Sequence, residues 1–335
     1  MRIVIAGAGA IGGYIGARLA KNGEDVVLVA RGPHLRAMQE RGLRVLSPDG
    51  DFEVTPQVTG DLATIGQADV VVLGVKAHGL TALAPQLAPL LGPETVVVST
   101  QNGIPWWYFQ GHGGELEGLR LERVDPGGVI AQAIESRRVV GSLAYFATDI
   151  VEPGVIRHTE GHKITLGEPD GTKSDRCRAL ATPLLAAGFR CPITTRFRHE
   201  IWVKLMGNVA FNPISALTGG TLEELARHPE VSRVIRNLMA ETQAVAAALA
   251  LDLPISIDQR MAGAEKVGAH KTSMLQDVEA GRPMELEAIV GAVVELGERL
   301  GVAMPATQTV YACAKMLDEK LTMRRAIQAS AGGHA

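Results

Sequence analysis

The stretch R-I-V-I-A-G-A-G-A-I-G, residues 2–12, decides the fold class of this chain. Residues 2–6 form an apolar run of strand length, and residues 14–22 then carry apolar side chains at helical spacing. A G-x-G-x-x-G pattern between a strand and a helix is typical of the loop that holds a dinucleotide diphosphate at the helix N-terminus. The stretch therefore predicts a Rossmann-type α/β domain, with cofactor contacts from Gly7, Ala8, Gly9, Ala10, Ile11 and Gly12.

The residue after the second predicted strand indicates which dinucleotide binds. That strand spans residues 25–30, and Arg31 follows it, nineteen positions after Gly12. NAD-specific sites usually carry Asp or Glu near this place, whereas a guanidinium pairs with a 2′-phosphate. Arg31 therefore predicts NADPH as the cofactor. The alternative is a surface arginine that binds no ligand.

Two further apolar runs, residues 69–75 and 94–100, predict buried parallel strands. Lys76 follows the first run and Asn102 follows the second. Because ligands of open α/β sheets bind beyond the carboxyl ends of the strands, we expect both side chains to share a crevice with the glycine loop and Arg31. The other predicted strands are a hairpin over residues 43–58 and single strands over 139–147, 154–158 and 163–167.

The length of 335 residues suits two domains. Strand patterns end near residue 195, so we expect a Rossmann-type domain over 1–195, an all-α domain over 196–325 and a flexible tail over 326–335. The net charge of −3 gives no electrostatic footprint for nucleic acid, and no apolar run reaches membrane-spanning length. The three cysteines lack metal-ligand spacing, which favours reduced thiols, a cytoplasmic location and no metal site.

Residues 200–213, E-I-W-V-K-L-M-G-N-V-A-F-N-P, predict a helix with a polar ridge. Lys204, Asn208 and Asn212 recur every four residues, so all three point to one side. An ammonium and two carboxamides on one ridge can act together on a small oxygen-rich molecule. The alternative is a solvated polar face, because Lys and Asn are mostly exposed residues. Pro213 should end or kink the helix, since proline lacks an N–H and clashes with the preceding turn.

A long connection over residues 104–138 contains the consecutive aromatic residues Trp106, Trp107, Tyr108 and Phe109. Three interpretations remain open from the sequence. The segment is a lid or pocket wall, an oligomer contact, or a loop pinned by a small core of its own.

Two motifs of the second half, K-T-S-M-L-Q-D at 271–277 and G-R-P-M-E at 281–285, contain Ser273 and Glu285. Pro283 suits a first helical position, which would put Glu285 in the first turn of a helix. From spacing alone, Ser273 is a turn or cap residue, and Glu285 is an acid favoured by the helix dipole.

Together these motifs resemble the ketopantoate reductase (2-dehydropantoate 2-reductase) family over nearly the whole chain. The motifs that carry the resemblance are G-A-G-A-I-G, Arg31, V-K-A at Lys76, Q-N-G at Asn102, E-I-W-V-K-L-x-x-N-x-x-x-N-P, and T-S-M-L-Q-D followed by G-R-P-M-E. The resemblance implies NADPH-dependent reduction of a 2-oxo acid to a 2-hydroxy acid. The reaction it implies is 2-dehydropantoate to pantoate, as in pantothenate and CoA biosynthesis.

The resemblance also implies a role for each site residue. Lys204 matches the proton donor, and Glu285 matches a residue that contacts the cofactor and positions the site. The positions that match substrate-binding residues are Asn102, Asn208, Asn212 and Ser273. The positions that match further cofactor contacts are Lys76, Asn102 and Ala147.

Two departures from the family pattern concern the predicted substrate pocket. Compact members have a shorter connection after Q-N-G, without the aromatic insert, and some carry a further substrate-binding asparagine where residues 218–222 here read T-G-G-T-L. The alternatives are therefore a reductase of a different, larger 2-oxo acid on the same scaffold, and, in another class, a non-catalytic NADPH-binding sensor. The expected partner is a small molecule rather than nucleic acid or a membrane, and the apolar C-terminal helices permit a homodimer.

Overall fold

The computed structural model describes residues 1–332, with side chains described as far as residue 325, and divides into two compact units. The first, here called the sheet unit, comprises Met1–Gln101, Pro105–Arg120 and Asp125–Arg198. The second, here called the helical unit, comprises Asn102–Ile104, Leu121–Val124 and the chain from His199 onward. Two short segments of the first half therefore belong to the helical unit, whereas the predicted division placed a single boundary near residue 195.

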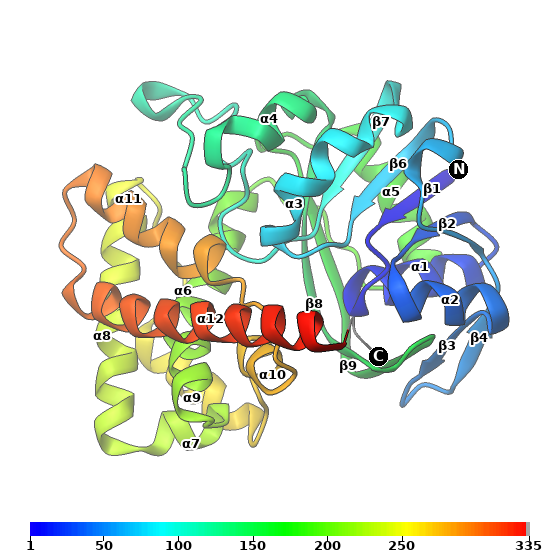
Figure 1. Cartoon of the computed structure of the whole chain (residues 1–335). Coiled ribbons are helices and arrows are strands. Elements are labelled where there is room, and N and C mark those ends of the chain that lie inside the picture. The colour runs from blue at the N-terminus through cyan, green and yellow to red at the C-terminus, as the bar shows by residue number, and fades with distance from the viewer. Residues whose placement is uncertain (333–335) are drawn as a thin grey trace. The chain divides into compact units, whose positions relative to one another are not determined.

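The sheet unit is built on a nine-stranded sheet of order β4-β3-β9-β8-β7-β6-β1-β2-β5 (Figure 1). Strands β7, β6, β1 and β2 are neighbours and run parallel, as the unbroken apolar runs predicted. The strand bounds are β1 Arg2–Ala6, β2 Asp25–Val29, β3 Leu43–Leu46, β4 Phe52–Val54, β5 Gln57–Thr59, β6 Ala68–Leu73, β7 Leu91–Ser99, β8 Val139–Glu152 and β9 Val155–Gly167.

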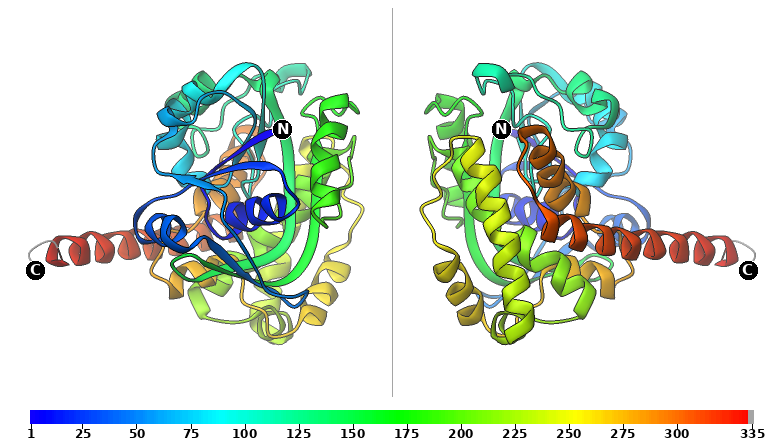
Figure 2. Two further views of the ribbon diagram at one scale, coloured as in Figure 1. Left: turned by 90° about the vertical axis from the view of Figure 1, so that its right-hand side faces the viewer. Right: turned by 90° about the vertical axis from the view of Figure 1, so that its left-hand side faces the viewer.

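Strands β8 and β9 form a long antiparallel hairpin, and Figure 2 shows them side by side as two curved strands. The separate strands predicted at 154–158 and 163–167 are one strand, because β9 continues through an irregular register opposite Ala147. The hairpin predicted over 43–58 is confirmed only as far as Val54. Beyond it, β5 pairs with β2 instead.

Helix α1 (Ala10–Lys21) packs on the sheet through apolar side chains. It buries Tyr14, Ile15 and Leu19 in the main core, together with the β1 residues Ile3 and Ile5. The other α-helices of the sheet unit are α2 (Gly32–Arg41), α3 (Ala77–Leu83), α4 (Val129–Ala133) and α5 (Asp175–Ala186).

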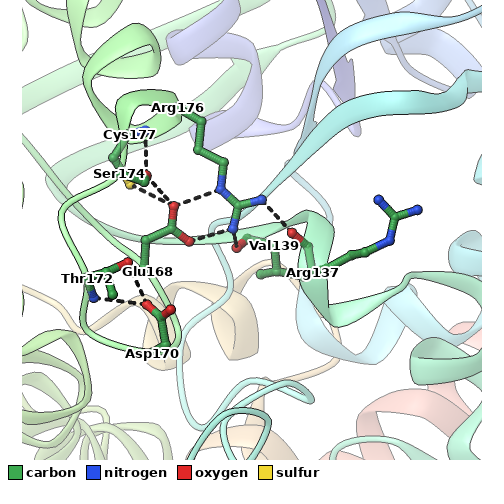
Figure 3. Close-up of polar contacts among 8 residues, drawn as sticks. All are labelled: Arg137, Val139, Glu168, Asp170, Thr172, Ser174, Arg176 and Cys177. Carbon is green, nitrogen blue, oxygen red and sulfur yellow. Dashed lines mark hydrogen bonds and ion pairs between the residues drawn. The ribbon is translucent and has the colours of Figure 1, made fainter.

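An ionic network fastens the start of α5 to the end of the sheet (Figure 3). Glu168 is buried, and its carboxylate accepts hydrogen bonds from both Nε and Nη2 of Arg176, the first at 2.7 Å, and from the Ser174 hydroxyl. The same guanidinium donates to the backbone carbonyls of Arg137 and Val139. The network links β8, β9 and α5, and every contact in it lies within the sheet unit.

The aromatic insert is buried inside the sheet unit. Trp106, Trp107, Tyr108 and Phe109 are each at most 7% exposed. The Arg198 guanidinium stacks on the Tyr108 ring and donates to the Tyr108 and Gln110 carbonyls. Buried rings offer no surface for an oligomer contact and fit a loop pinned by a small core, while the interpretation as a lid or pocket wall stays a prediction.

The helical unit contains α6 (Phe197–Thr218), α7 (Leu222–Arg227), α8 (Pro229–Ala248), α9 (Ile257–Val267), α10 (Ser273–Glu279), the π-helical turn Glu287–Gly291, α11 (Ala292–Leu300) and α12 (Pro305–Gly332). The prediction was that the first of these helices would end or kink at Pro213, and the helix does not end there. The helix continues to Thr218 because residues 209–216 are all buried, and their packing offsets the lost hydrogen bond.

The C-terminal helix extends beyond the predicted domain end at residue 325. Helix α12 includes residues as far as Gly332, so part of the stretch predicted as a tail is helical, and the rest of that stretch, 333–335, lies outside the described residues. Within the described part of the chain, no helix has the length and apolarity needed to span a bilayer.

Candidate active site

The carboxyl ends of the central parallel strands gather three of the predicted cofactor residues. Gly7 follows β1, Arg31 follows β2 by two positions, and Lys76 follows β6 by three, each in the sheet unit. Arg31 is exposed and precedes α2, while Lys76 is half-buried and precedes α3. Because β6, β1 and β2 are parallel neighbours, these residues share one edge of the sheet.

The glycine loop has the geometry that a bound diphosphate requires. Gly7 has φ +109°, and a side chain there would lie 2.5 Å from Val75 Cγ1. A side chain at Gly12 would meet Ile5 Cγ2 at 3.0 Å and Gly74 Cα at 3.1 Å, so the helix packs against the sheet by backbone. At Gly9 the nearest atom would be Gly74 O at 4.0 Å, which leaves this side of the loop open to a ligand.

The N-terminus of α1 is likewise suited to an anion. Gly9 is its N-cap, no side chain caps it, and its first turn carries no acidic residue. The free N–H groups and the helix dipole therefore favour a phosphate at this end.

The Q-N-G motif after β7 divides between the two units. Gln101 belongs to the sheet unit, where its amide donates to the Leu73 and Val75 carbonyls at 2.8 and 2.9 Å and ties the end of β7 to β6. Asn102 belongs to the helical unit, where its Nδ2 donates to Glu285 Oε2 at 3.3 Å. Sequence reasoning placed Asn102 correctly after a strand and missed the structural role of Gln101.

The helical unit contains the predicted polar ridge on α6. Lys204 and Asn208 are half-buried and Asn212 is buried. The pKa of Lys204 is lowered from 10.5 to about 8, chiefly because burial disfavours the ammonium, while the Glu285 carboxylate opposes the change and Arg260 adds to it. Burial and a second cation therefore outweigh the carboxylate, which the sequence left undecided.

Glu285 lies outside the helix predicted to contain it. The helical residues begin at Leu286, and the Glu285 carbonyl accepts from the Ile289 N–H at 3.2 Å. Pro283 and Glu285 therefore precede the helix, and the predicted first-turn placement is wrong. The Glu285 side chain is 8% exposed and holds Asn102, so it is a buried polar partner rather than an exposed dipole acid.

The other two predicted site residues lie in different units. Ser273 is the exposed first residue of α10, and Thr272, not Ser273, is the N-cap that accepts from Leu275 N. Ala147 lies on β8 in the sheet unit, where the register with β9 is irregular.

Arg260 was missed in the sequence. Its guanidinium occupies the space in which a side chain at Gly207 would lie, with Nε 2.5 Å and Cζ 2.7 Å from an ideal Cβ at that position. The signal that could have found this contact is the glycine itself, because glycine in mid-helix is disfavoured and often marks a close approach.

A cluster in the sheet unit, Asp49, His158 and His162, brings three possible metal-ligand atoms together. The ring nitrogens of His158 already contact Ser47 Oγ at 3.0 Å and the Gly161 carbonyl at 2.7 Å. Both ring nitrogens of His158 therefore have protein partners, and His162 Nε2 lies 3.5 Å from Asp49 Oδ2. The expectation of no metal site stays a prediction.

Two protein-family models match this chain. The ketopantoate reductase PanE/ApbA model matches residues 3–171, and the C-terminal model of the same family matches residues 196–318. The chain belongs to the ketopantoate reductase family.

Ketopantoate reductase relatives match this chain over nearly its full length. A 2-dehydropantoate 2-reductase of Mesorhizobium japonicum is 49% identical, over 95% of this chain and 98% of its own. A crystal structure from Ralstonia solanacearum, described as a candidate ketopantoate reductase, has a TM-score of 0.91 and 40% identity, and the match covers 96% of this chain and 98% of that one. The 2-dehydropantoate 2-reductase structure from Geobacter metallireducens has a TM-score of 0.82 at 29% identity, covering 94% and 99%. The predicted fold class, a Rossmann-type domain followed by a helical one, is confirmed.

Proposed function

We propose that this chain is an NADPH-dependent oxidoreductase that reduces 2-dehydropantoate to pantoate, the step that serves pantothenate and CoA biosynthesis. The observation that carries the proposal is Lys204. Its ammonium lies on a polar helix face and has a pKa of about 8, and the chain belongs to the ketopantoate reductase family. An acid with a pKa near the working pH donates protons efficiently and still remains largely protonated at pH 7.

In the proposed mechanism each side chain of the ridge has a distinct task. NADPH, when bound, supplies the hydride that reduces the 2-oxo carbon. The Lys204 ammonium stabilises the negative charge that develops on the keto oxygen and then gives it a proton from Nζ. Asn208 and Asn212, one and two turns further along α6, bind hydroxyl or carbonyl groups of the substrate, and Ser273 binds its carboxylate.

Glu285 and Asn102 form the positioning pair of this mechanism. Glu285 holds the Asn102 amide at 3.3 Å and, through its charge, keeps part of the Lys204 population protonated by opposing the effect of burial. We assign both residues to cofactor contact as well, and Asn102 also to the substrate. These assignments rest on their contacts within the helical unit and on the family motifs that contain them.

The assignment of NADPH as the cofactor rests on residues at one edge of the sheet. Gly7, Gly9 and Gly12 leave room for a diphosphate at the α1 N-terminus. Arg31 lies exposed beyond β2, with no acidic residue in the α2 turn that follows it, and would pair with the 2′-phosphate. Lys76 and Ala147 complete the proposed cofactor contacts.

The test is the loss of NADPH absorbance with a panel of 2-oxo acids, namely 2-dehydropantoate, 2-oxoisovalerate and larger 2-oxo acids, repeated with NADH. We expect the highest kcat/KM with 2-dehydropantoate and NADPH, and we expect Arg31→Ala to raise KM for NADPH by roughly 10-fold or more while KM for NADH stays unchanged. A higher kcat/KM for a larger acid would reassign the substrate. NADPH binding without oxidation by any acid would overturn the proposal in favour of a sensor.

Location and assembly form the last part of the proposal. All three cysteines are free thiols, which fits the reducing cytoplasm that we propose as the location. We propose a small-molecule partner, and a homodimer is the assembly to test by light scattering.

A further inference from the structure

Hydrogen bonds attach the short segment Asn102–Ile104 to residues 285–288 of the helical unit. The Asn102 amide donates to Glu285 Oε2 at 3.3 Å, and the Ile104 N–H donates to the Ala288 carbonyl at 2.9 Å. Gly103 lies between the two donors and has no role in the mechanism proposed above.

Gly103 packs so closely against the helical unit that no side chain fits at its position. Its φ is +87°, in the left-handed region that favours glycine. A Cβ there would lie 2.1 Å from the carbonyl oxygen of Ala288, 2.4 Å from its carbonyl carbon and 2.9 Å from the nitrogen of Ile289. These are backbone atoms, which cannot rotate away as the end of a flexible side chain can. A side chain at position 103 would therefore push the segment off the helical unit.

The π-helical turn Glu287–Gly291 presents the Ala288 carbonyl to Ile104. In an α-helix the Ala292 N–H would donate to the Ala288 carbonyl, whereas here it donates to the Glu287 carbonyl. The wide turn thus releases the Ala288 carbonyl from that bond, and Ile104 donates to it. Turns of this kind are rare and frequently lie at functional sites.

Packing and a tyrosine hold the π-helical turn in place. Ala288 and Ile289 are buried. The Tyr311 hydroxyl lies 2.9 and 2.8 Å from the two carboxylate oxygens of Glu287 and donates its proton to that carboxylate. The turn is therefore a fixed surface on which the segment Asn102–Ile104 is located.

We propose that Gly103 is a positioning residue, which lets the segment lie on the π-helical turn so that the Asn102 amide reaches Glu285. The inference rests on the proposed function, in which Asn102 contacts both the cofactor and the substrate. Gly103 has no side chain of its own and acts through the placement of Asn102. A misplacement of about 1 Å in such a group can lower the rate roughly 100-fold, because the reacting atoms are then held in the wrong geometry.

This role differs from simple packing in one measurable respect. A residue that only packs affects stability, and any effect on kcat/KM adds to that of a second substitution. A residue that positions Asn102 loses its effect on kcat/KM once the Asn102 side chain has been removed. A double-mutant cycle between positions 102 and 103 is therefore the readout.

The experiment measures kcat/KM for 2-dehydropantoate with NADPH, per folded molecule, in wild type, Gly103→Ala, Asn102→Ala, the double variant and the control Gly301→Ala. Gly301 also belongs to the helical unit and has a φ of +68°, but a Cβ there would meet nothing within 4 Å. The control thus introduces similar backbone strain without a collision.

We expect Gly103→Ala and Asn102→Ala each to lower kcat/KM by about 10- to 100-fold. The double variant should lie within about threefold of the lower single variant, because both substitutions remove the same placement of the amide. Gly301→Ala should stay within about twofold of wild type.

Tyr311→Phe tests the π-helical turn without a collision at position 103. Loss of the hydroxyl removes its contacts with Glu287 and lets the turn relax, so we expect kcat/KM to fall by about 3- to 10-fold. In the Asn102→Ala background the same substitution should have no further effect. If Gly103→Ala does not fold, this second cycle gives the answer.

Three outcomes would overturn the inference while leaving the proposed function intact. The first is an active wild type whose kcat/KM changes less than about twofold in Gly103→Ala, or in Tyr311→Phe where Gly103→Ala does not fold. The second is a double variant whose loss equals the product of the two single losses. The third is a fall in Gly301→Ala as large as that in Gly103→Ala. A wild type inactive on every 2-oxo acid would overturn the proposed function and this inference together.

Discussion

Glu168–Arg176 in the sheet unit and Glu285–Lys204 in the helical unit each bring a carboxylate and a cation together in the protein interior, and the two cations titrate in opposite directions. The pKa of Arg176 is raised, first by its hydrogen bonds to Glu168. The pKa of Lys204 is lowered to about 8, first by burial. Glu168 is 4% exposed and Glu285 8%, so the burial of the carboxylates does not explain the difference.

The two pKa shifts differ in their largest cause, which is hydrogen bonding for Arg176 and burial for Lys204. Arg176 donates two hydrogen bonds to Glu168 and two more to backbone carbonyls, which replace the water it has lost (Figure 3). Lys204 interacts with Glu285 through charge, and the nearby charge of Arg260 opposes that attraction. The Glu168–Arg176 pair therefore keeps both charges, whereas the lowered pKa of Lys204 fits the proton donor that we propose.

The largest expected effect on activity comes from replacing Lys204, the cation of the helical unit. Lys204→Ala should lower kcat by roughly 10²- to 10⁴-fold, because no other group is proposed to protonate the keto oxygen. NADPH binding, followed by fluorescence titration, should be unchanged. A variant with near-normal turnover would remove Lys204 from the mechanism.

The same variant should not lose stability. Between about pH 8 and 10.5 the unfolded chain binds more protons at Lys204 than the folded chain, so wild-type stability rises with pH through this window. Lys204→Ala should lack that rise in urea unfolding experiments. A fall in stability with pH over the same window would contradict the lowered pKa.

Replacing Glu168, the carboxylate of the sheet unit, should lower stability and leave activity nearly unchanged. Glu168→Ala should cost about 2–3 kcal/mol of unfolding free energy, below the range of a fully buried pair because the Arg176 side chain is 33% exposed. Activity at 25 °C should stay within twofold. The control Arg178→Gln breaks an exposed pair with Asp175 and should cost under about 0.5 kcal/mol.

A smaller effect is expected from Glu285→Gln, which keeps the shape of the side chain and removes its charge. Without the carboxylate the pKa of Lys204 falls further, so the alkaline limb of the kcat/KM profile moves to lower pH. At pH 10, above the pKa in both proteins, kcat/KM should fall about 10-fold for each unit by which the pKa of Lys204 falls. A limb that stays in place would show that Glu285 acts on Lys204 by packing alone.

The smallest effect concerns thiol reactivity. Burial raises the pKa of Cys177 to about 11 and that of Cys191 to about 12, whereas Cys313 is exposed. Iodoacetamide should therefore modify Cys313 in the native enzyme and leave activity unchanged, and mass spectrometry would detect the modification. Cys177 contacts Glu168 at 3.6 Å, so its faster labelling in Glu168→Ala would report opening of the network.

The sequence alone determined the local elements of this protein. Residues 2–12 encode a strand, a turn and a helix start in consecutive positions, and the four-residue spacing of Lys204, Asn208 and Asn212 places them on one helix face. These features depend on backbone geometry and periodicity over short distances, which is why they could be read directly.

The tertiary structure alone decided which distant residues meet. It moved Asn102 into the helical unit beside Glu285, buried the aromatic insert, carried α6 through Pro213 and set Arg260 against Gly207. The pKa of Lys204 was likewise undecided in the sequence, because burial and the charges of two residues far along the chain act in opposite directions. The local spacing of residues carries no information about tertiary contacts or about the pKa of Lys204. Only packing brings these groups within range of one another.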